Sequence, residues 1–337
     1  MRIVSKAPCR VDLAGGTLDI WPLYLNHAGA VTVNFAVDRY TTCSLETHAG
    51  DSIKIRSQDL KISEAFLSLA HLRRRPKPKL PLPAHVLRFF GAPSGLSMHT
   101  HSDAPAGAGI SGSSALIIAI ASALNRLNQS GYTIEKIREI SQNVEAQILR
   151  VPTGCQDYYP AMYGGVNALE LGPAGIRRSA IRVDLDDFNE RIVLAFTGEP
   201  RNSGINNWEV TKAYIDGDRA VHRNFDRIGA IAIAMRDAVE KGAWTEVGRL
   251  LREEWTNRRK NAPGITTPLI DELVRVSRKA GALGAKVCGA GGGGCVFFLV
   301  ERGARERVSQ VIAASGVTVL PVKVAPKGVQ VKVTQTE

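Results

Sequence analysis

A glycine- and serine-rich segment that runs directly into an apolar stretch is the part of the sequence best suited to bind a phosphate. It reads Asp103-Ala-Pro-Ala-Gly-Ala-Gly-Ile-Ser-Gly-Ser-Ser-Ala-Leu-Ile-Ile-Ala-Ile-Ala-Ser-Ala-Leu124, and its second half predicts a buried helix. Glycines leave backbone amides uncovered, serines add hydroxyl groups, and the start of a helix adds positive potential. The residues concerned are Gly107, Gly109, Ser111, Gly112, Ser113 and Ser114. They predict a phosphate site, and a glycine-rich loop that only caps a core helix is the alternative.

The same segment matches the G-x-G-x-x-G fingerprint of dinucleotide-binding proteins from Gly107 to Gly112. That fingerprint requires a strand ending at its first glycine and a second strand, carrying an acidic residue, about 20 residues farther on. Here Asp103-Ala-Pro-Ala separates the expected strand 96–101 from the glycines, and the expected helix 115–127 is followed by a second helical pattern at 134–150. A nicotinamide site is therefore disfavoured. A Walker G-x-x-x-x-G-K-[ST] motif is not present in the sequence.

Two carboxylates, Glu145 and Asp157, flank a break in that second helical pattern. The helix that carries Glu145 is expected to stop before Pro152, and a helical pattern restarts near Gln156. Both carboxylates are thus placed to face one cleft. One would hold Mg²⁺, and the other would accept or orient the proton of an attacking hydroxyl group. The alternative is a glutamate on a helix face and an aspartate that caps a helix.

A polar cluster surrounds the turn Gly15-Gly16, which ends an expected strand from Ile3 to Ala14 that Pro8 interrupts. Its members are Arg10, Asp12, Thr17 and Asp19. Short polar side chains on a glycine turn suit a polyhydroxylated ligand, because each can hydrogen-bond a hydroxyl group at close range. A turn that satisfies only its own polar groups is the alternative.

A second glycine run lies between two expected strands in the segment Lys286–Val300. It reads Gly289-Ala-Gly-Gly-Gly-Gly294. Glycine at these positions permits very close approach of the backbone, either to a ligand or to the first glycine loop.

Histidine and cysteine spacing gives no clear metal site. His99 and His101 would point to the same side of one strand, but no third ligand lies near them, so two surface histidines are the simpler expectation. The five cysteines are scattered, odd in number and without a C-x-x-C motif. Neither a disulfide framework nor a zinc site is implied, and a reducing cytosol fits this pattern.

The elements that must position these residues form an α+β pattern. Further strands are expected at 30–38, 40–47, 52–57, directly after Gly165, and at 192–196, 317–324 and 329–334, and further helices at 60–72, 84–90, 206–215, 219–240, 245–255, 269–280 and 302–314. A length of 337 residues favours two domains. The turn Gly172-Pro-Ala-Gly175 is the expected boundary, which gives domains 1–175 and 176–337.

Composition limits the partners. A formal charge of +11 invites a nucleic-acid interpretation, but only 6% of the residues are aromatic and no finger or ribonucleoprotein signature occurs. Five cations between Arg73 and Lys79 predict a solvated, proline-stiffened loop; this loop or Arg201 could instead bind a phosphate carried by a substrate. The N-terminus has no signal-like apolar region, and no apolar run approaches the roughly 20 residues of a membrane span. A soluble, cytoplasmic protein without membrane or nucleic-acid partners is therefore expected, and its oligomeric state stays open.

Three segments, in this order, resemble the motifs of the GHMP kinase superfamily, which includes galactokinase, homoserine kinase and mevalonate kinase. Ala7–Asp19 resembles the motif that binds the phosphate acceptor, Pro105–Ala115 the nucleotide phosphate loop, and Lys286–Val300 a glycine loop that supports the other two. Within the superfamily, the chain resembles bacterial D-glycero-D-manno-heptose 7-phosphate kinases and the related L-fucokinase domain. The shared pieces are the A-G-G turn, Gly29-Ala-Val, Gln156-Asp157, Gly164-Gly165, Thr197–Gly204 and Cys288–Gly294. The resemblance extends from Lys6 to Gly328.

This resemblance implies a two-domain α+β fold, with a ribosomal-protein-S5-like N-terminal domain and a ferredoxin-like C-terminal domain. It implies an ATP-dependent sugar kinase that uses Mg²⁺ and acts on a sugar or sugar phosphate. Asp157 would be the catalytic base, and Arg10 the cation that keeps it ionised. Glu145 and Ser113 would hold Mg²⁺, with Ser114 as the alternate.

The resemblance also implies two sets of binding residues. Those expected at the nucleotide are Pro105, Gly107, Ala108, Gly109, Ser111, Gly112, Ser113 and Ser114. Those expected at the acceptor sugar are Arg10, Gly15, Gly16, Thr17, Asp19, Gly291 and Gly292.

Two departures from the family pattern leave details open. The second motif is commonly G-L-G-S-S, whereas this chain has Gly109-Ile-Ser-Gly-Ser-Ser114, so which hydroxyl group reaches the metal is open. The first motif reads Gly-Gly-Thr-Leu-Asp where heptose kinases tend toward Gly-Gly-Gly-Thr-Asp, so the acceptor is open too. A heptose 7-phosphate or similar sugar, phosphorylated at an anomeric hydroxyl, is the main hypothesis.

Three alternatives remain at this point. The first is an anomeric kinase of an unphosphorylated sugar such as fucose, galactose or a uronic acid. The second is a non-catalytic sugar sensor, although such a protein could dispense with Glu145 and Asp157, and this chain has both. The third is an RNA-binding protein that uses the positive charge, which steeply salt-dependent binding would reveal.

Overall fold

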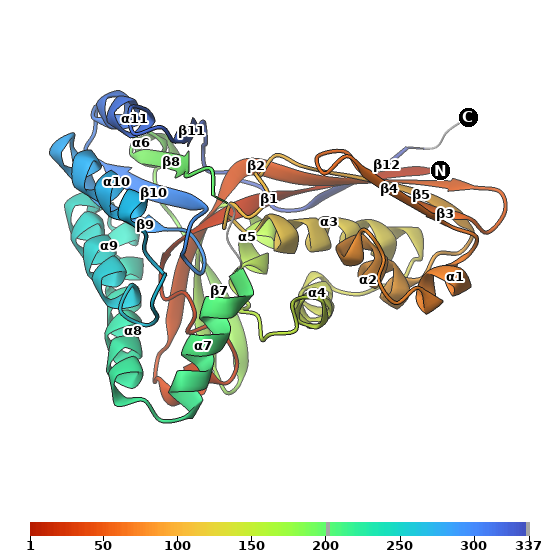
Figure 1. Cartoon of the computed structure of the whole chain (residues 1–337), viewed down its shortest axis with the longest axis horizontal. Helices are drawn as coiled ribbons and strands as arrows, with labels where there is room; N and C mark the ends of the chain where they lie inside the picture. The colour runs from red at the N-terminus through yellow and green to blue at the C-terminus, as the bar shows by residue number, and fades with distance from the viewer. Residues whose placement is uncertain (200–202, 335–337) are drawn as a thin grey trace.

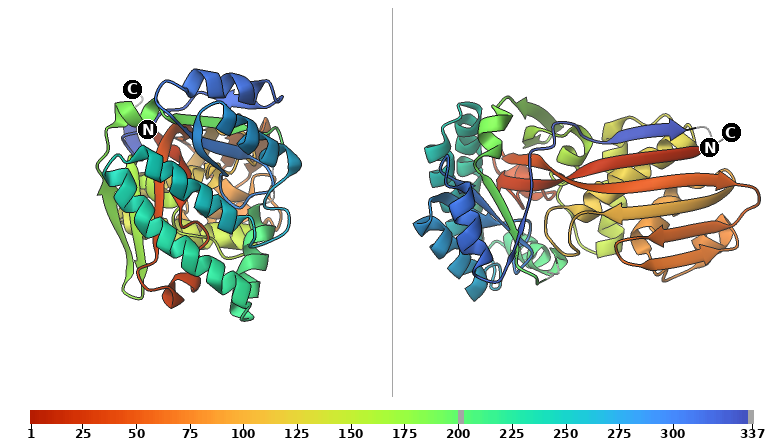
Figure 2. Two further views of the ribbon diagram at one scale, coloured as in Figure 1. Left: turned by 90° about the vertical axis from the view of Figure 1, so that its left-hand side faces the viewer. Right: turned by 90° about the horizontal axis from the view of Figure 1, so that it is seen from above.

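Two sheets, each covered by helices, form the framework of the chain. The computed structural model describes residues 1–199 and 203–334. The two sheets lie toward opposite ends of an elongated molecule (Figure 1). The long strands β1 (Arg2–Ala14) and β2 (Val31–His48) run from the far end of the larger sheet toward the smaller one, as the view from above shows (Figure 2).

The larger sheet has eight strands in the order β12-β1-β2-β5-β3-β4, with β6 paired to β2 and β7 paired to β6. Among the described strands of this sheet, only β3 and β5 pair in parallel. Its other strands are β3 (Ile53–Ser57), β4 (Ile62–Phe66), β5 (Gly95–Ser102), β6 (Val166–Gly172), β7 (Gly175–Ile181) and β12 (Gln330–Thr334). The helices of this part are α1 (Leu69–Arg74), α2 (Pro81–Phe90), α3 (Gly112–Leu127), α4 (Ile134–Leu149) and α5 (Tyr158–Tyr163). Figure 1 shows α2, α3 and α4 on one side of this sheet.

The smaller sheet is antiparallel, with the order β11-β8-β10-β9. Its strands are β8 (Ile192–Phe196), β9 (Ala282–Val287), β10 (Cys295–Val300) and β11 (Thr318–Leu320). The helices of this part are α6 (Leu185–Asn189), α7 (Ser203–Ile215), α8 (Arg219–Glu240), α9 (Trp244–Arg258), α10 (Pro268–Lys279) and α11 (Arg305–Ala313), and a short 3-10 helix, η1, spans Leu23–Asn26. Of the helices described, none combines the length and apolarity needed to cross a membrane.

Helix α3 occupies the centre of the larger core because nearly all of its faces are apolar. Ile117, Ile118, Ile120 and Leu124 are fully buried, and the helix packs against β1 and β2. The predicted helix 115–127 is thereby confirmed, with a start at Gly112. No strand lies between α3 and α4, so the dinucleotide-binding arrangement is absent from this segment.

Several strand and helix predictions need correction. The expected helix 60–72 is wrong: Ile62–Phe66 is strand β4, whose side chains alternate between half-buried and exposed along its pairing with β3, and the helix begins only after the capping residue Ser68. The expected strands 30–38 and 40–47 are one strand, β2. Strand β1 continues through Pro8, with its register shifting between Pro8 and Cys9, as expected where a residue lacks a backbone N–H.

The turn Gly172–Gly175 joins β6 and β7 into a hairpin, and β7 was not expected from the sequence. The expected domain boundary at 175 therefore falls at the tip of this hairpin. The C-terminal strand β12 returns to pair with β1. The division into 1–175 and 176–337 stays a prediction.

Candidate active site

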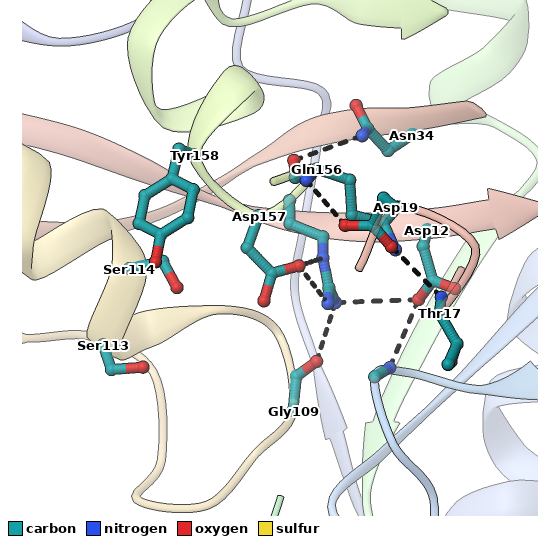
Figure 3. A network of polar contacts seen from close by, with 12 residues as sticks. Asp12, Thr17, Asp19, Asn34, Gly109, Ser113, Ser114, Gln156, Asp157 and Tyr158 are labelled. Carbon is teal, nitrogen blue, oxygen red and sulfur yellow. Dashed lines mark hydrogen bonds and ion pairs between the residues drawn. The ribbon is translucent and has the colours of Figure 1, made fainter. Parts of the chain in front are cut away.

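One cavity of about 500 Å³ collects the residues in which the sequence analysis placed chemistry. Its described lining includes residues from the first motif, the glycine loop before α3, the α4–α5 connection, the end of α9 and the second glycine run. Figure 3 shows a network of polar contacts that includes several of the lining residues. Strand β1 and helix α3 supply rigid walls, and the loops that join the elements supply most of the polar groups.

The glycine loop before α3 is shaped by left-handed backbone conformations. Gly107 and Gly109 have φ values of 70° and 76°, and Ser111 has φ 58°. Ser111 is the N-cap residue of α3, but its side chain makes no capping hydrogen bond, and its buried Oγ has no hydrogen-bond partner. The first turn of α3 therefore faces the cavity without a side-chain cap, which is a favourable place for an anion.

Glu145 is held by three hydroxyl groups. Ser113 Oγ donates to Oε1 at 2.6 Å, and Ser114 Oγ and Tyr158 OH donate to Oε2 at 2.8 and 2.6 Å. Burial raises the pKa of Glu145, and the three hydroxyl donors oppose this effect. Ser113 is exposed whereas Ser114 is buried, so Ser113 is the hydroxyl more open to the cavity.

This oxygen-only group fits Mg²⁺, which prefers hard oxygen ligands and commonly takes one or two carboxylates plus phosphate oxygens. Of the histidine pair, His99 is exposed, as expected from the sequence, and His101 lies 3.2 Å from Asp103. Within residues 1–199 and 203–334, no three histidine, cysteine or acidic side chains come together as a metal site.

Asp157 and Arg10, both on the cavity lining, form a close ion pair. Arg10 Nε and NH2 both donate to Oδ1 of Asp157, at 2.9 and 2.6 Å. Arg10 NH1 also donates to the carbonyl oxygen of Gly109, at 2.8 Å. The guanidinium thus links the carboxylate to the glycine loop (Figure 3). The Asp157 side chain is 31% exposed, whereas that of Arg10 is 3% exposed, so the carboxylate remains open to a substrate.

The turn after β1 presents Thr17 and Asp19 to the same cavity. Asp19 accepts hydrogen bonds from the backbone N–H groups of Gln156, at 2.8 Å, and Thr17, at 3.1 Å. Burial, reinforced by the charge of Asp157, raises the pKa of Asp19 from its usual 3.8 to about 6. This carboxyl group can therefore change its charge near neutral pH.

Four charged residues behind this turn form a buried network. Its members are Asp12 on β1, Glu254 and Arg258 on α9, and Lys286 on β9. Lys286, Asp12 and Glu254 have fully buried side chains. Arg258 also donates to the carbonyl oxygen of Gly289 at 2.7 Å and lines the cavity.

The sequence analysis missed Glu254 and Arg258, named Lys286 only as the start of a motif, and placed Asp12 in the cluster suited to a polyhydroxylated ligand. Asp12 is instead fully buried away from the cavity lining, where it pairs with Lys286. The sequence does contain a signal that Glu254 and Arg258 are buried. The two occur at helical spacing with the apolar Leu250, Leu251 and Trp255. A charge on the buried face of a helix predicts a partner charge. The sequence could not show which charges pair with Glu254 and Arg258. Two of these partners, Lys286 and Asp12, are themselves 274 positions apart in the sequence.

The second glycine run packs against the first glycine loop. The backbone N–H of Cys295 donates to the carbonyl oxygen of Ala108 at 2.7 Å, and a Cβ atom on Gly294 would lie 2.8 Å from that oxygen. The sequence analysis expected this glycine run to approach either a ligand or the first glycine loop, and the structure shows the approach to the first glycine loop. Gly289 and Ala290 line the cavity, whereas Gly291 and Gly292 pack against Ile265.

Most predicted site residues therefore meet in one place. Those that line the cavity are Arg10, Thr17, Asp19, Pro105, Gly107, Ala108, Gly109, Ser111, Gly112, Ser113, Ser114, Glu145 and Asp157. Gly15 and Gly16 form the turn behind Thr17, where a Cβ atom would collide with Val31 O and with Arg258 NH1 respectively. Of the basic loop, Lys79 lines the cavity. Arg201 lies outside the described residues.

Two family models and several curated relatives match this chain. The family model for the N-terminal domain of GHMP kinases matches residues 82–165, and the model for the C-terminal domain of GHMP kinases matches residues 235–318. A D-glycero-alpha-D-manno-heptose 7-phosphate kinase of Campylobacter jejuni is 26% identical over 306 residues, covering 89% of each chain. An L-fucokinase/L-fucose-1-P guanylyltransferase of Bacteroides fragilis is 27% identical, covering 88% of this chain and 34% of the relative.

Solved structures share the fold along the whole chain. A D-glycero-D-manno-heptose 1-phosphate kinase of Bacteroides thetaiotaomicron matches with a TM-score of 0.78 at 24% identity, covering 99% of this chain and 100% of the other. A galactokinase of Lactococcus lactis, in complex with galactose, matches with a TM-score of 0.79 at 20% identity, covering 98% and 95%. This chain therefore has the fold of these two solved structures.

Proposed function

Because this chain belongs to the GHMP kinase superfamily and is an ATP-dependent sugar kinase, we propose that it transfers the γ-phosphate of ATP to a hydroxyl group of a heptose phosphate or a similar sugar. The observation that carries the proposal is the position of Asp157. Its carboxylate is fixed on Arg10 beside the glycine loop and opens into the same cavity as Thr17 and Asp19. A nucleotide phosphate on the loop and a sugar on the turn would therefore meet at Asp157.

Asp157 is the proposed base. The attacking hydroxyl oxygen forms a bond to the γ-phosphorus while the bond to the β,γ-bridging oxygen breaks, and the hydroxyl proton passes to the carboxylate. A carboxylate is a weak base toward an alcohol, so it orients the hydroxyl group and accepts the proton late in the transfer. The ion pair with Arg10 fixes Oδ1 of Asp157, which leaves Oδ2 available to the acceptor.

Negative charge on the transferred group is proposed to be balanced by the glycine loop and the first turn of α3. The N–H groups at this helix start have no side-chain cap, and the first helix residues line the cavity. The left-handed residues Gly107, Gly109 and Ser111 uncover further amides. Such fixed dipoles need no rearrangement during the reaction, which makes them effective in stabilising charge.

Mg²⁺ fits the proposal through Glu145 and Ser113. Both carry oxygen ligands, they are joined by a 2.6 Å hydrogen bond, and both line the cavity beside the helix start. When bound with ATP, the ion would supply positive charge to the β- and γ-phosphate oxygens. Tyr158 and Ser114 would hold the carboxylate of Glu145 in place from its other oxygen.

An anomeric kinase of an unphosphorylated sugar is the second candidate. Beyond Arg10, the residues that the first motif brings to the cavity are Thr17 and Asp19, which suit hydroxyl groups, and Arg258 nearby is engaged with Gly289 and Asp12. The two candidate functions differ in whether the acceptor carries a phosphate. Arg258 and Lys79, both on the cavity lining, are the residues that could contact such a phosphate.

The proposed function is tested by an ADP-release screen with purified protein, ATP and Mg²⁺. The acceptors are hexoses, heptoses and their terminal phosphates. We expect ADP release to depend on a heptose phosphate, with at most weaker turnover of the unphosphorylated sugars. The same low rate with every acceptor and with none would contradict a sugar kinase, and strong turnover of fucose or galactose alone would favour the second candidate.

A further inference from the structure

Asp12 has contacts that no catalytic or binding role described above requires. It lies on β1 with a fully buried side chain, and it receives the Nζ of Lys286 at 2.5 Å and the backbone N–H of Gly289 at 3.2 Å. Arg10 NH1 lies 3.6 Å from Oδ1 of Asp12, and Arg258 NH1 lies 3.7 Å from Oδ2. Burial alone would raise the pKa of Asp12, but the charges of Lys286, Arg10 and Arg258 hold it well below its usual range.

Lys286 is an unusual residue for its position. It lies on β9 with 0% of its side chain exposed, in a strand whose other residues are apolar or glycine. Its second anionic neighbour is Glu254, at 3.5 Å, whose carboxylate oxygens make no hydrogen bond. A buried ion pair adds little net stability, because the cost of removing both charges from water offsets their attraction. An apolar residue would therefore serve the core as well, so stability alone does not explain this lysine.

The network leads to the catalytic pair. From Lys286 on β9, contacts pass to Asp12 on β1, then to Arg10 on the same strand, and from Arg10 to Asp157 before α5. Asp157, Gly109 and Asp12 all contact the single guanidinium group of Arg10, and dashed lines mark these contacts beside the three labelled residues in Figure 3. Asp12 therefore holds the side of Arg10 that faces away from Asp157.

Without Asp12, the guanidinium of Arg10 would lose one of the three groups that surround it. Arg10 NH1 would keep its hydrogen bond to the carbonyl oxygen of Gly109, but the carboxylate charge that attracts it from 3.6 Å would be gone. Among the described residues, Asp157 would then be the only carboxylate still paired with the guanidinium. Misplacement of a catalytic group by a fraction of an ångström lowers the rate of transfer without a matching loss of binding.

We propose that Asp12 and Lys286 are positioning residues for the transfer reaction. Lys286 keeps Asp12 ionised and in place, and Asp12 orients Arg10 so that Nε and NH2 both meet Oδ1 of Asp157. The inference rests on the proposed function, since it assigns Asp157 as the base. Asp12 and Lys286 do not line the cavity, whereas Arg10 and Asp157 do. The expected signature is therefore a fall in kcat with nearly unchanged KM values for ATP and the acceptor.

The test is a double-mutant cycle on Asp12→Asn and Lys286→Met, measured as kcat and as KM for both substrates. Asn keeps the shape of Asp and an oxygen that can accept from Gly289, and Met keeps most of the length of Lys. We expect each single variant to lower kcat about tenfold or more, with both KM values within about twofold of wild type. We expect the double variant to be no slower than the slower single variant, because both changes act through Arg10.

Arg191→Met is the matched control. It removes a mostly buried cation that pairs with Asp187 at 3.0 Å and lies outside the cavity. It is expected to lower the melting temperature while kcat stays at the wild-type value. If Lys286→Met alone does not fold, Asp12→Asn and the double variant, which leaves no unpaired lysine or aspartate, carry the test.

Wild-type kcat in the folded Asp12→Asn and double variants would overturn the inference. The inference would also be overturned if the fold-reductions in kcat of the two single variants multiply in the double variant. Such independent effects would mean that Asp12 and Lys286 do not act through one path. A wild-type protein that phosphorylates no sugar would instead overturn the proposed function, and the inference with it. If the wild type phosphorylates a sugar and the variants keep its kcat, the further inference fails but the proposed function stands.

Discussion

Arg10 donates two hydrogen bonds, from Nε and NH2, to the same oxygen of Asp157. This geometry leaves the other carboxylate oxygen of Asp157 without a bond to Arg10, and Arg10 NH1 binds the glycine loop at Gly109. A planar guanidinium can make all three contacts at once, whereas an ammonium group is a point charge that cannot reproduce this fork. The pair therefore depends on the shape of arginine as well as on its charge.

Replacing Arg10 tests that dependence. Arg10→Lys keeps the charge, so we expect the protein to fold and bind ATP while kcat falls about tenfold or more. Arg10→Met also removes the charge and should lower kcat further. Steady-state kinetics beside ATP-binding titrations measure both effects. Equal kcat in wild type and Arg10→Lys would show that only the charge matters.

The hydroxyl groups around Glu145 give a prediction about Mg²⁺. Ser113→Ala removes the exposed donor to Oε1 and should raise the Mg²⁺ concentration at half-maximal rate about tenfold or more, in the range of losses for residues that orient metal ligands. Tyr158→Phe removes a donor to Oε2 and should act in the same direction but more weakly. Calorimetric titration of Mg²⁺ with a non-hydrolysable ATP analogue gives the same ranking without turnover. An unchanged Mg²⁺ requirement in Ser113→Ala would exclude Ser113 as a ligand and direct attention to Ser114.

Asp19 gives a pH dependence. Its pKa of about 6 means that the acceptor side gains a proton as the pH falls below 6, so hydrogen bonds from sugar hydroxyl groups to the carboxylate weaken. We expect the KM for the acceptor to rise below pH 6 while the KM for ATP changes little. In Asp19→Asn, the acceptor KM should be high and independent of pH. A flat acceptor KM between pH 5 and 8 in the wild type would contradict the assignment.

The same shift predicts a change in stability. Between about pH 4 and 6, the folded state keeps a proton on Asp19 that the unfolded chain has released. The free energy of unfolding therefore falls as the pH rises through this window. Relative to wild type, Asp19→Asn should become more stable as the pH rises from 4 to 7, as denaturant unfolding at several pH values would reveal.

Gly294 tests the contact between the two glycine loops. It has φ +78°, and a Cβ atom there would lie 2.8 Å from Ala108 O, so Gly294→Ala should displace the phosphate loop and raise the KM for ATP about tenfold or more. Gly303→Ala is the matched control, because Gly303 has the same φ of +78° but open space around its Cβ position. It should cost about 1 kcal/mol of stability through backbone strain alone and leave the KM for ATP unchanged. Equal KM values in the two variants would disconnect the second loop from nucleotide binding.

Local patterns were sufficient to predict much of this molecule. Helix α8 and strand β8 have the bounds that the apolar periodicity gives, and the glycine loop could be located because glycine and serine runs before a helix have few other uses. Strand β4 could not be predicted, because its short alternating pattern has no meaning until β3 lies beside it. Short apolar segments fit helix and strand equally well, and tertiary pairing decides between them.

The candidate site likewise has residues that local sequence order predicts and residues that only the folded chain reveals. Glu145 and Asp157 lie 12 positions apart around one helix break, so their convergence could be inferred from local order. In the buried network, Asp12 lies more than 200 positions from both Glu254 and Lys286, and only the folded chain brings them together. The roles of Gly15 and Gly16 likewise depend on what lies behind them, namely Val31 and Arg258.

The central claim is that Asp157 receives the proton of a sugar hydroxyl group as phosphate moves from ATP. The most direct measurement is the yield of sugar phosphate and ADP from the wild type and from Asp157→Asn, followed by phosphorus NMR, with ATP binding measured in parallel. The account predicts one ADP for each sugar phosphate in the wild type, and a kcat lower by about 10²-fold or more in Asp157→Asn at unchanged ATP affinity. Near-full turnover in Asp157→Asn would contradict it.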